Sequence, residues 1–280
     1  MLDVLQTMIN FIAKPPYEMR HLQRVSSIVR GEQIAAYLGN ARLNPDNPSE
    51  NDVYIFVKPH IKLGNSFDFP KKSWVDIQDG FDLVEVLKRY PDVGVIAYGD
   101  LAYELLSKQL MNRIVNIPHH HVNFERTVRK RDKILKVGTT GSPPAWNYIP
   151  EVIKEGIKKR GLKLELYSNF YPRMSVSRFH ESVDIFIHWR PFLDRKLSCP
   201  FKIINAASFG VPTIALDEPS FKEVEDCYIG VKTAEEWLGV LDRLLGDPIL
   251  YKNISDKCLE TAEKYHIENI AKLYEELDNV

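Results

Sequence analysis

The chain has 280 residues, 44% of them hydrophobic, which is enough for one large core or two modest ones, and two domains of ordinary size fit this length. Its 37 lysines and arginines are balanced by 38 aspartates and glutamates, so the net charge of −1 excludes a global basic field for nucleic acid. The three cysteines have neither an even number nor a metal-binding spacing, which argues against a disulfide framework or a zinc site. We therefore expect a cytoplasmic protein.

The N-terminus predicts no membrane anchor. Asp3 stands where a signal peptide would carry positive charge, and no apolar run reaches the length of a membrane span. Any membrane contact is expected to be peripheral.

The first elements in chain order are a short strand and a helix. An apolar run from Met8 ends at two prolines, which is typical of a buried strand that leads into a loop. Residues 25–39 have apolar side chains at helical spacing, with Ser26 and Ser27 as capping candidates and Gly39 as the stop. Residues 40–52 are polar and contain two prolines, so we expect a loop there.

The alternation of strands and helices continues through the N-terminal half. Strands are predicted at residues 52–58, 73–80, 93–100 and 113–121, and helices at 81–92 and 101–110. Asp76 and Asp79 surround the end of one strand, where parallel sheets present functional side chains; a simple chain reversal at Asp79 and Gly80 is the alternative. The three histidines from His119 are neighbours in an extended chain and point to opposite faces in turn, so we expect no metal site.

A charged stretch at residues 124–133 breaks the apolar rhythm and predicts a linker. We expect Rossmann-like domains at residues 1–130 and 131–280. The second begins with a strand that runs into a turn rich in glycine, threonine and serine, then a helix at 149–161 and a strand at 162–170. Near the C-terminus, Thr233 and Glu236 predict a capped helix, and two linked helices follow.

The stretch from Cys199 to Ser220 predicts a loop, a helix that stops at Gly210 and a buried strand. Lys202 falls near the start of this helix, at the edge where open α/β sheets bind ligands, so it can help to hold a diphosphate. An ordinary crossover with a surface lysine is the alternative. A strand that ends at His188 leads into a loop with three further cations, Arg190, Arg195 and Lys196. They can converge with Lys202 on one anion, or form a solvated basic loop.

The segment P-F-K-I-I-N-A-A-S-F-G-V-P-T-I-A resembles the donor-site segment of GT-B glycosyltransferases, and the nearest resemblance is to the retaining, family 4-like group. That resemblance implies an α/β fold with two Rossmann-like domains, a cleft between them and a C-terminal helix that crosses back to the first domain. Asn205 stands where the family has a ribose-binding glutamate, and Leu197 replaces its partner glutamate. Arg30 and Gly31 match an Arg-Gly pair that lies beside the donor phosphates in the family, and Thr139, Thr140 and Ser142 stand where its members commonly carry an Arg and a Lys. The other residues expected to bind the donor are Gly141, His188, Arg190, Lys196, Lys202 and Asn205.

The function implied is transfer of a hexose from a nucleotide-diphosphate sugar to an acceptor hydroxyl, which belongs to a sugar, a lipid-linked sugar or a protein. No Asp-x-Asp triplet occurs, so we expect no metal cofactor, and retention of configuration follows from the nearest resemblance. Asp79 is the expected catalytic carboxylate, with Asp76, His119 and His60 as further candidates. The alternatives are a binding or scaffold protein on a degenerate GT-B fold and, third, a nucleotide-sugar epimerase.

Overall fold

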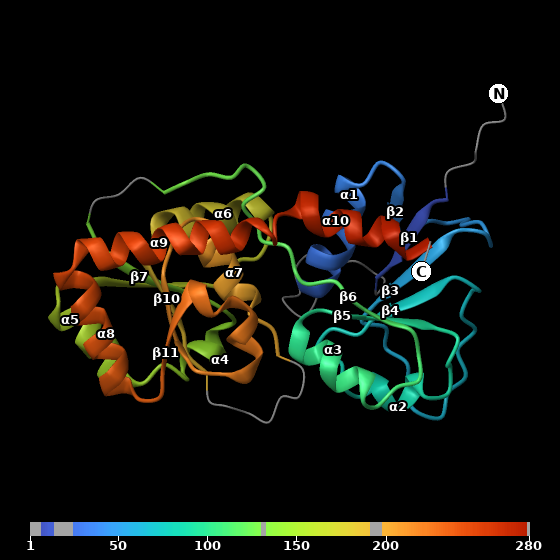
Figure 1. The fold of residues 1–280 in the computed structure, drawn as a ribbon, viewed down its shortest axis with the longest axis horizontal. Coiled ribbons are helices and arrows are strands. Elements are labelled where there is room, and N and C mark those ends of the chain that lie inside the picture. Colours follow the sequence, from blue (N-terminus) through green and yellow to red (C-terminus); the bar gives the residue numbers. More distant parts are fainter. Residues whose placement is uncertain (1–6, 14–24, 130–132, 191–197, 279–280) are drawn as a thin grey trace. The chain divides into compact units, whose positions relative to one another are not determined.

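The computed structural model describes residues 7–13, 25–129, 133–190 and 198–278 (Figure 1). The described parts of Met1–His119, Arg195–Cys199 and Ile267–Val280 form one compact unit, and those of His120–Asp194 and Pro200–His266 form a second. Each unit has its own parallel sheet, which confirms the predicted α/β class. The charged stretch 124–133 falls in the second unit, and the division into domains at residue 130 stays a prediction.

The first unit contains a sheet of six described strands in the order β2-β1-β3-β4-β5-β6, all parallel. The strands are β1 (Ile9–Ile12), β2 (Ala41–Leu43), β3 (Val53–Val57), β4 (Ser73–Asp76), β5 (Gly94–Ala97) and β6 (Ile114–Asn116). The chain moves from β1 outward to β2 and then in the other direction from β3, so the order reverses between β1 and β3. Open α/β sheets bind ligands beyond the carboxyl ends of the strands at such a reversal.

Helices cover both faces of the first sheet (Figure 1). They are the π-helical turn η2 (Ser27–Glu32), α1 (Gln33–Tyr37), α2 (Leu83–Leu87), α3 (Asp100–Ser107), α10 (Ile267–Glu275) and the short 3-10 helix η4 (Glu276–Asp278). α1 packs against α10 on one side of the sheet, and α2 and α3 lie on the other. Buried Val75, Leu87 and Leu106 belong to one apolar core beneath α2 and α3. The chain's last helix therefore belongs to the first unit, as the resemblance implies.

Two sequence predictions for the first unit were wrong. The expected loop at 40–52 contains strand β2, which pairs with β1 at the edge of the sheet. A three-residue, half-exposed edge strand in a polar segment is too short to give a periodic signal. The helix predicted from a Ser26 or Ser27 cap already includes Val25, and Ser26 has helical backbone angles and makes no side-chain cap.

The second unit contains a sheet of five described strands in the order β11-β10-β9-β7-β8, again all parallel. The strands are β7 (Lys136–Thr140), β8 (Lys163–Tyr167), β9 (Ile185–His188), β10 (Thr213–Leu216) and β11 (Tyr228–Val231). The chain runs from β7 to β8, then returns to β9 on the other side of β7. The reversal between β7 and β9 makes the carboxyl ends of these two strands the expected ligand-binding edge.

Helices cover both faces of the second sheet as well. They are α4 (Pro143–Trp146), α5 (Glu151–Lys159), α6 (Arg173–Ser182), α7 (Phe201–Ala207), the 3-10 helix η3 (Pro219–Cys227), α8 (Ala234–Gly246) and α9 (Pro248–Glu263). α5 and α8 share one apolar core with the sheet, and α7, η3 and α9 share another. Gly210 has φ of +67°, a left-handed angle that ends the α7 segment and turns the chain into β10, as predicted. The Thr233 side chain accepts a hydrogen bond from Glu236 N, which confirms the predicted cap.

A buried histidine on α6 predicts acid sensitivity of the second unit. The His180 ring is 1% exposed and lies among Phe179, Phe186 and Phe209. Neither of its ring nitrogens has a hydrogen-bond partner among the described residues. Burial therefore lowers its pKa to about 3, because the charged form would lose its hydration.

The unfolded chain binds a proton on His180 near pH 6.5 and the folded chain does not, so stability falls as the pH falls below that value. Between pH 7 and pH 5 we expect this histidine to cost about 2 kcal/mol of unfolding free energy. When unfolding is measured with urea, the unfolding free energy of His180→Leu should fall by about 2 kcal/mol less between pH 7 and pH 5 than that of the wild type. The same substitution at exposed His60 is the control. Equal pH dependence in the wild type and His180→Leu would contradict the argument.

Candidate active site

Four predicted residues lie at the carboxyl edge of the second sheet, where the strand order reverses. Thr139 and Thr140 end β7, Gly141 follows them, and His188 ends the neighbouring β9. Thr139, Thr140 and His188 are each less than 8% exposed. The structure thus brings together residues that are separated by nearly fifty positions in the sequence, at the edge where ligands bind in sheets of this kind.

Lys202 extends from α7 to the end of β7. Its Nζ donates a hydrogen bond of 2.7 Å to the carbonyl oxygen of Thr140. A Cβ added at Gly141 would lie 3.3 Å from the same Nζ, so the missing side chain at Gly141 leaves room for the ammonium group. The structure thus places a positive charge at the strand end that the sequence predicted.

His188 lies in a buried, positively charged environment. Burial, and after it the charges of Lys202 and Arg190, hold its pKa well below the ordinary histidine value. The imidazole is therefore neutral near pH 7. Within the described part of the chain its buried Nε2 has no hydrogen-bond partner.

Arg190 forms a bidentate ion pair with Glu218. Arg190 Nε and Nη2 each lie 2.9 Å from one Glu218 oxygen, and Glu218 is 6% exposed. This carboxylate follows β10, the strand beside β9, and it fixes the plane of the guanidinium group. Lys196 and Arg195, which were predicted to join the same cluster, lie outside the described residues.

Sequence reasoning missed two side chains at this edge, Glu218 and Trp146. The Trp146 Nε1 atom is buried, has no partner among the described residues, and lies 3.8 Å from the Cβ position at Gly141. The only sequence signal for Glu218 is its place directly after a predicted strand. For Trp146, four positions beyond the serine of the turn, the sequence gives no signal at all.

The Asn205 side chain forms a hydrogen bond within the second unit. The side chain is 3% exposed, and its Oδ1 accepts a hydrogen bond of 2.9 Å from Val122 N. Asn205 therefore fastens the segment at Val122 to α7. Asn205 stands at the sequence position where the GT-B glycosyltransferases that this segment resembles have a glutamate. In this chain its amide oxygen accepts the hydrogen bond from Val122 N.

In the first unit, Arg30 and Asp76 form an ion pair with no exposed side-chain surface on either partner. Arg30 Nε donates to Asp76 Oδ2 at 2.7 Å, and Nη1 donates to the carbonyl oxygen of Pro118 at 2.7 Å. Gln78 Nε2 donates to the other carboxylate oxygen, and Tyr274 on α10 donates its hydroxyl to Oδ2 at 3.3 Å. Burial raises the pKa of Tyr274, so that hydroxyl keeps its proton. The donor-binding and catalytic roles expected of Arg30 and Asp76 stay predictions.

Gly31 packs among apolar side chains. A Cβ added there would lie 3.3 Å from Leu43 Cδ1 and 3.9 Å from both Ala13 Cβ and Val57 Cγ2. The donor-binding role of Gly31 stays a prediction, and what the structure shows is close packing of η2 on the sheet.

Asp79 differs from Asp76 in being exposed. Its Oδ1 accepts a hydrogen bond of 2.5 Å from Lys58 Nζ, and the two side chains are 60% and 34% exposed. Lys58 follows β3 and has a positive φ of 44°, and Gln78, just before Asp79, has a φ of 52°. Left-handed angles at residues other than glycine cost energy and are concentrated at functional sites. His119 is 7% exposed with its ring 5.5 Å from that of Tyr98, and His60 is exposed.

The described residues contain no group of three or more histidine, cysteine, aspartate or glutamate side chains arranged to hold a metal ion. Among them there is also no helix with the length and apolar character needed to cross a bilayer.

Comparisons with known proteins identify the fold. No protein-family profile matches the chain. An uncharacterized glycosyltransferase of Haemophilus influenzae is 30% identical over 182 residues, which are 59% of this chain and 50% of that protein. The crystal structure of HepE from Anabaena, in complex with UDP and glucose, matches with a TM-score of 0.61 and 10% identity over 95% of this chain and 98% of that one. The structure of TarM matches with a TM-score of 0.54 and 14% identity, over 88% of this chain and 58% of that one.

The chain has the GT-B fold. This confirms the fold that the resemblance implied. The chain spans half the length of the curated relative that it matches. A structure of MnaA from S. aureus with UDP, which is 10% identical, also matches, with a TM-score of 0.50 over 95% of this chain and 94% of that one.

Proposed function

We propose that the chain is a glycosyltransferase that moves a sugar from a nucleotide-diphosphate sugar to an acceptor hydroxyl. The observation that carries this proposal is the position of Lys202 Nζ, which lies at the end of β7 beside Gly141, where the sheet order reverses. The name of the Haemophilus influenzae relative and the UDP and glucose bound to HepE support the same assignment.

The reaction breaks the bond between the sugar and the diphosphate, so negative charge grows on the departing oxygen. A charge that is already in place stabilises that oxygen without reorganising solvent. Lys202 supplies this charge in our proposal, and Arg190, whose charge is balanced by Glu218, supplies further hydrogen-bond donors.

Two finer features belong to the proposal. Cationic side chains neutralise the diphosphate, so the reaction proceeds without a divalent ion. The sugar keeps its anomeric configuration, as the resemblance to the retaining group implies. A transfer assay run with EDTA and with added magnesium tests the first feature. Proton NMR of the anomeric signal of the product tests the second.

The direct test of the donor site is a thermal-shift titration with UDP, GDP, ADP and CDP. A nucleotide that binds only the folded protein at a hundred times its dissociation constant stabilises it by about 2.7 kcal/mol. We expect one diphosphate to raise the melting temperature in proportion to the logarithm of its concentration. If all four leave the melting temperature unchanged, the proposed donor site is wrong.

Replacing Lys202 with alanine is expected to weaken nucleotide binding about tenfold or more. The substitution removes a charge-assisted contact worth roughly 1.5 to 3 kcal/mol. Titration calorimetry with the diphosphate found in the thermal-shift panel measures the effect. Lys158→Ala on the exposed side of α5 is the matched control and should bind normally. Unchanged nucleotide affinity in both Lys202→Ala and Arg190→Ala would contradict diphosphate binding at this edge of the sheet.

One observation favours a second candidate function, a binding or scaffold protein that keeps the fold without the reaction. Asn205 replaces the family glutamate and is committed to Val122 N in the second unit. Such a protein would bind a nucleotide or sugar without turnover. Nucleotide binding with no transfer to any acceptor in a broad glycan and lipid-linked sugar panel would support this candidate over the enzyme.

A further inference from the structure

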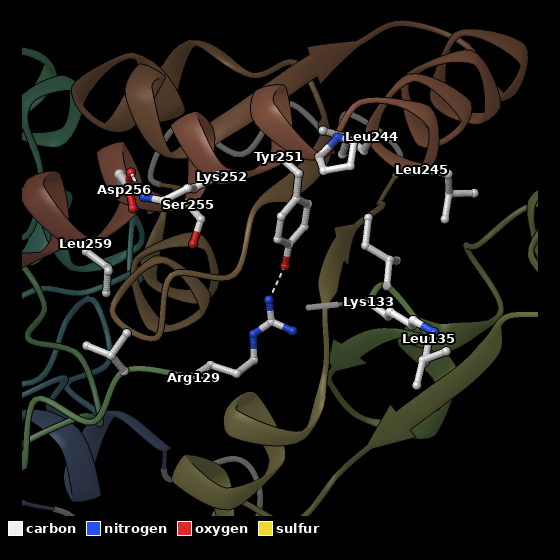
Figure 2. A pocket seen from close by; sticks show the side chains of 13 residues that line it. Arg129, Lys133, Leu135, Leu244, Leu245, Tyr251, Lys252, Ser255, Asp256 and Leu259 are labelled. Carbon is white, nitrogen blue, oxygen red and sulfur yellow. Dashed lines mark hydrogen bonds and ion pairs between the residues drawn. The ribbon is translucent and has the colours of Figure 1, made fainter. Parts of the chain in front are cut away.

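A cavity of about 800 Å³ lies in the second unit, away from the proposed donor edge. Figure 2 shows it between the segment before β7 and the helices α8 and α9. Leu135 lines the cavity directly before β7, so the cavity lies at the amino ends of the strands, whereas Lys202 lies at the carboxyl end of β7. The volume is within the range of small-molecule sites, about 300 to 1,000 Å³.

The walls of the cavity are mostly apolar. Aliphatic side chains and one proline line it, namely Val128, Ile134, Leu135, Leu244, Leu245, Pro248 and Leu259. Val128 and Leu135 are 52% and 54% exposed, and Ile249, next to Pro248, is 74% exposed. Water next to such surface is displaced favourably by an apolar ligand, and large apolar side chains exposed together mark binding sites.

The polar groups of the cavity favour an anion. Arg129 has a side chain that is 6% exposed, pairs with Asp184 and donates to the Tyr251 hydroxyl (Figure 2). Its Nε is buried and has no partner within the described residues, although a buried donor without a partner is costly.

Two lysines add positive charge to the lining. Lys133 is exposed beside the apolar wall, and Lys252 on α9 pairs with Asp256 at 2.5 Å. Asp256 supplies the one carboxylate in the described lining, and this pair neutralises it. Arg129 and Asp184 balance each other as well, so among the described lining residues Lys133 carries the excess positive charge.

We propose that this cavity binds an anionic amphiphile, a molecule with one apolar chain and a phosphate or carboxylate head group. The chain lies against the aliphatic wall from Leu135 to Leu259, and the head group lies at Lys133, beside Arg129 in the lining. Residues 130–132 lie outside the described residues. The proposal is independent of the donor site, because the two share no residue.

The test uses dodecyl phosphate below its micelle concentration, titrated calorimetrically into the full chain. We expect saturable binding with one site, and at least tenfold weaker binding in Lys133→Glu and in Leu135→Glu, which place negative charge beside the head group and the chain. Both positions are exposed, so these variants should fold. Lys158→Glu and Leu63→Glu are matched controls at exposed positions away from the cavity and should bind as the wild type does.

Two further titrations decide the chemistry and the source of the ligand. Dodecyltrimethylammonium, which has the same chain and the opposite charge, should bind at least tenfold more weakly than dodecyl phosphate. Cosedimentation with phosphatidylglycerol vesicles that Lys133→Glu abolishes identifies a membrane lipid as the source, and binding of the monomer alone identifies a free amphiphile. The proposal would be overturned if the chain bound neither dodecyl phosphate nor the vesicles, or if it bound the two dodecyl compounds equally well. It would also be overturned if Lys133→Glu and Leu135→Glu both bound dodecyl phosphate with wild-type affinity.

Discussion

Replacing Arg30 with methionine is expected to lower the unfolding free energy of the first unit by about 3 to 5 kcal/mol. The guanidinium group holds Asp76 in a site with no exposed side-chain surface, and it also satisfies the carbonyl oxygen of Pro118. Without Arg30, a carboxylate remains buried, and among the described residues Gln78 and Tyr274 are its remaining side-chain donors. Such an uncompensated charge costs far more than the lost contact. Hydrogen exchange of the β3 and β4 amides, read by mass spectrometry, measures the opening free energy locally.

Two variants separate the buried charge from other causes. Arg42→Met makes the same change at an exposed position in β2 and should shift stability by less than about 0.5 kcal/mol. In Arg30→Met/Asp76→Leu both partners become apolar, and most of the lost stability should return because no charge is left unpaired. If the single and the double variant are equally unstable, the loss comes from packing around Arg30, and the ion-pair argument fails.

The elements of this fold were largely predictable because their signals are local. Alternating apolar runs and helical spacings identified the strands from β3 to β10 and the longer helices α3, α5, α8 and α9, and the left-handed Gly210 after α7 followed from its residue type. The short helix α4 and the 3-10 helix η3 were not predicted. Strand β2 was missed as well, because it is formed by two half-buried residues and the exposed Arg42, and its pairing with β1 depends on the tertiary fold.

The side-chain contacts of the candidate site were much less predictable. Arg30 and Asp76 are 46 positions apart and pair in the interior, although charged residues are normally placed at the surface by composition alone. Asn205 shows the same limit: a sequence motif places the residue on α7 and cannot show that its amide binds Val122 N. Glu218 was missed because its ion pair with Arg190 depends on β9 and β10 being neighbours.

Gly141 and Lys202 show when sequence reasoning does reach a contact. Both were expected at the carboxyl edge of one sheet, since Gly141 follows a predicted strand and Lys202 lies at the start of the helix that leads to another strand. The observed hydrogen bond from Lys202 to Thr140 O joins the two segments across 62 positions. The order of the parallel strands predicts that these two segments lie close together, whereas the contact distance between Lys202 and Thr140 follows only from the side-chain position in the structure.

Asp79→Asn is expected to lower the rate of sugar transfer at least a hundredfold while nucleotide affinity stays unchanged. In the proposed enzyme this carboxylate accepts the proton of the acceptor hydroxyl, and the loss of a general base costs 10²- to 10⁴-fold. Asp76 is the other carboxylate near this strand end, but all of its observed hydrogen bonds hold the interior together. Asp79 is exposed at the same edge, and Lys58 Nζ lies 2.5 Å from its Oδ1.

The measurement compares kcat for transfer with the dissociation constant of the nucleotide in the same preparation. Asp82→Asn changes an exposed aspartate three positions further on and should leave both values as in the wild type. The Asp79 variant should also melt normally, because an exposed ion pair contributes about 0 to 1 kcal/mol. Equal losses of nucleotide binding and rate would make Asp79 a structural residue. A variant that turns over at nearly the normal rate would leave His119 and His60 as the candidates for the base, and His119→Gln and His60→Gln would then be measured in the same way.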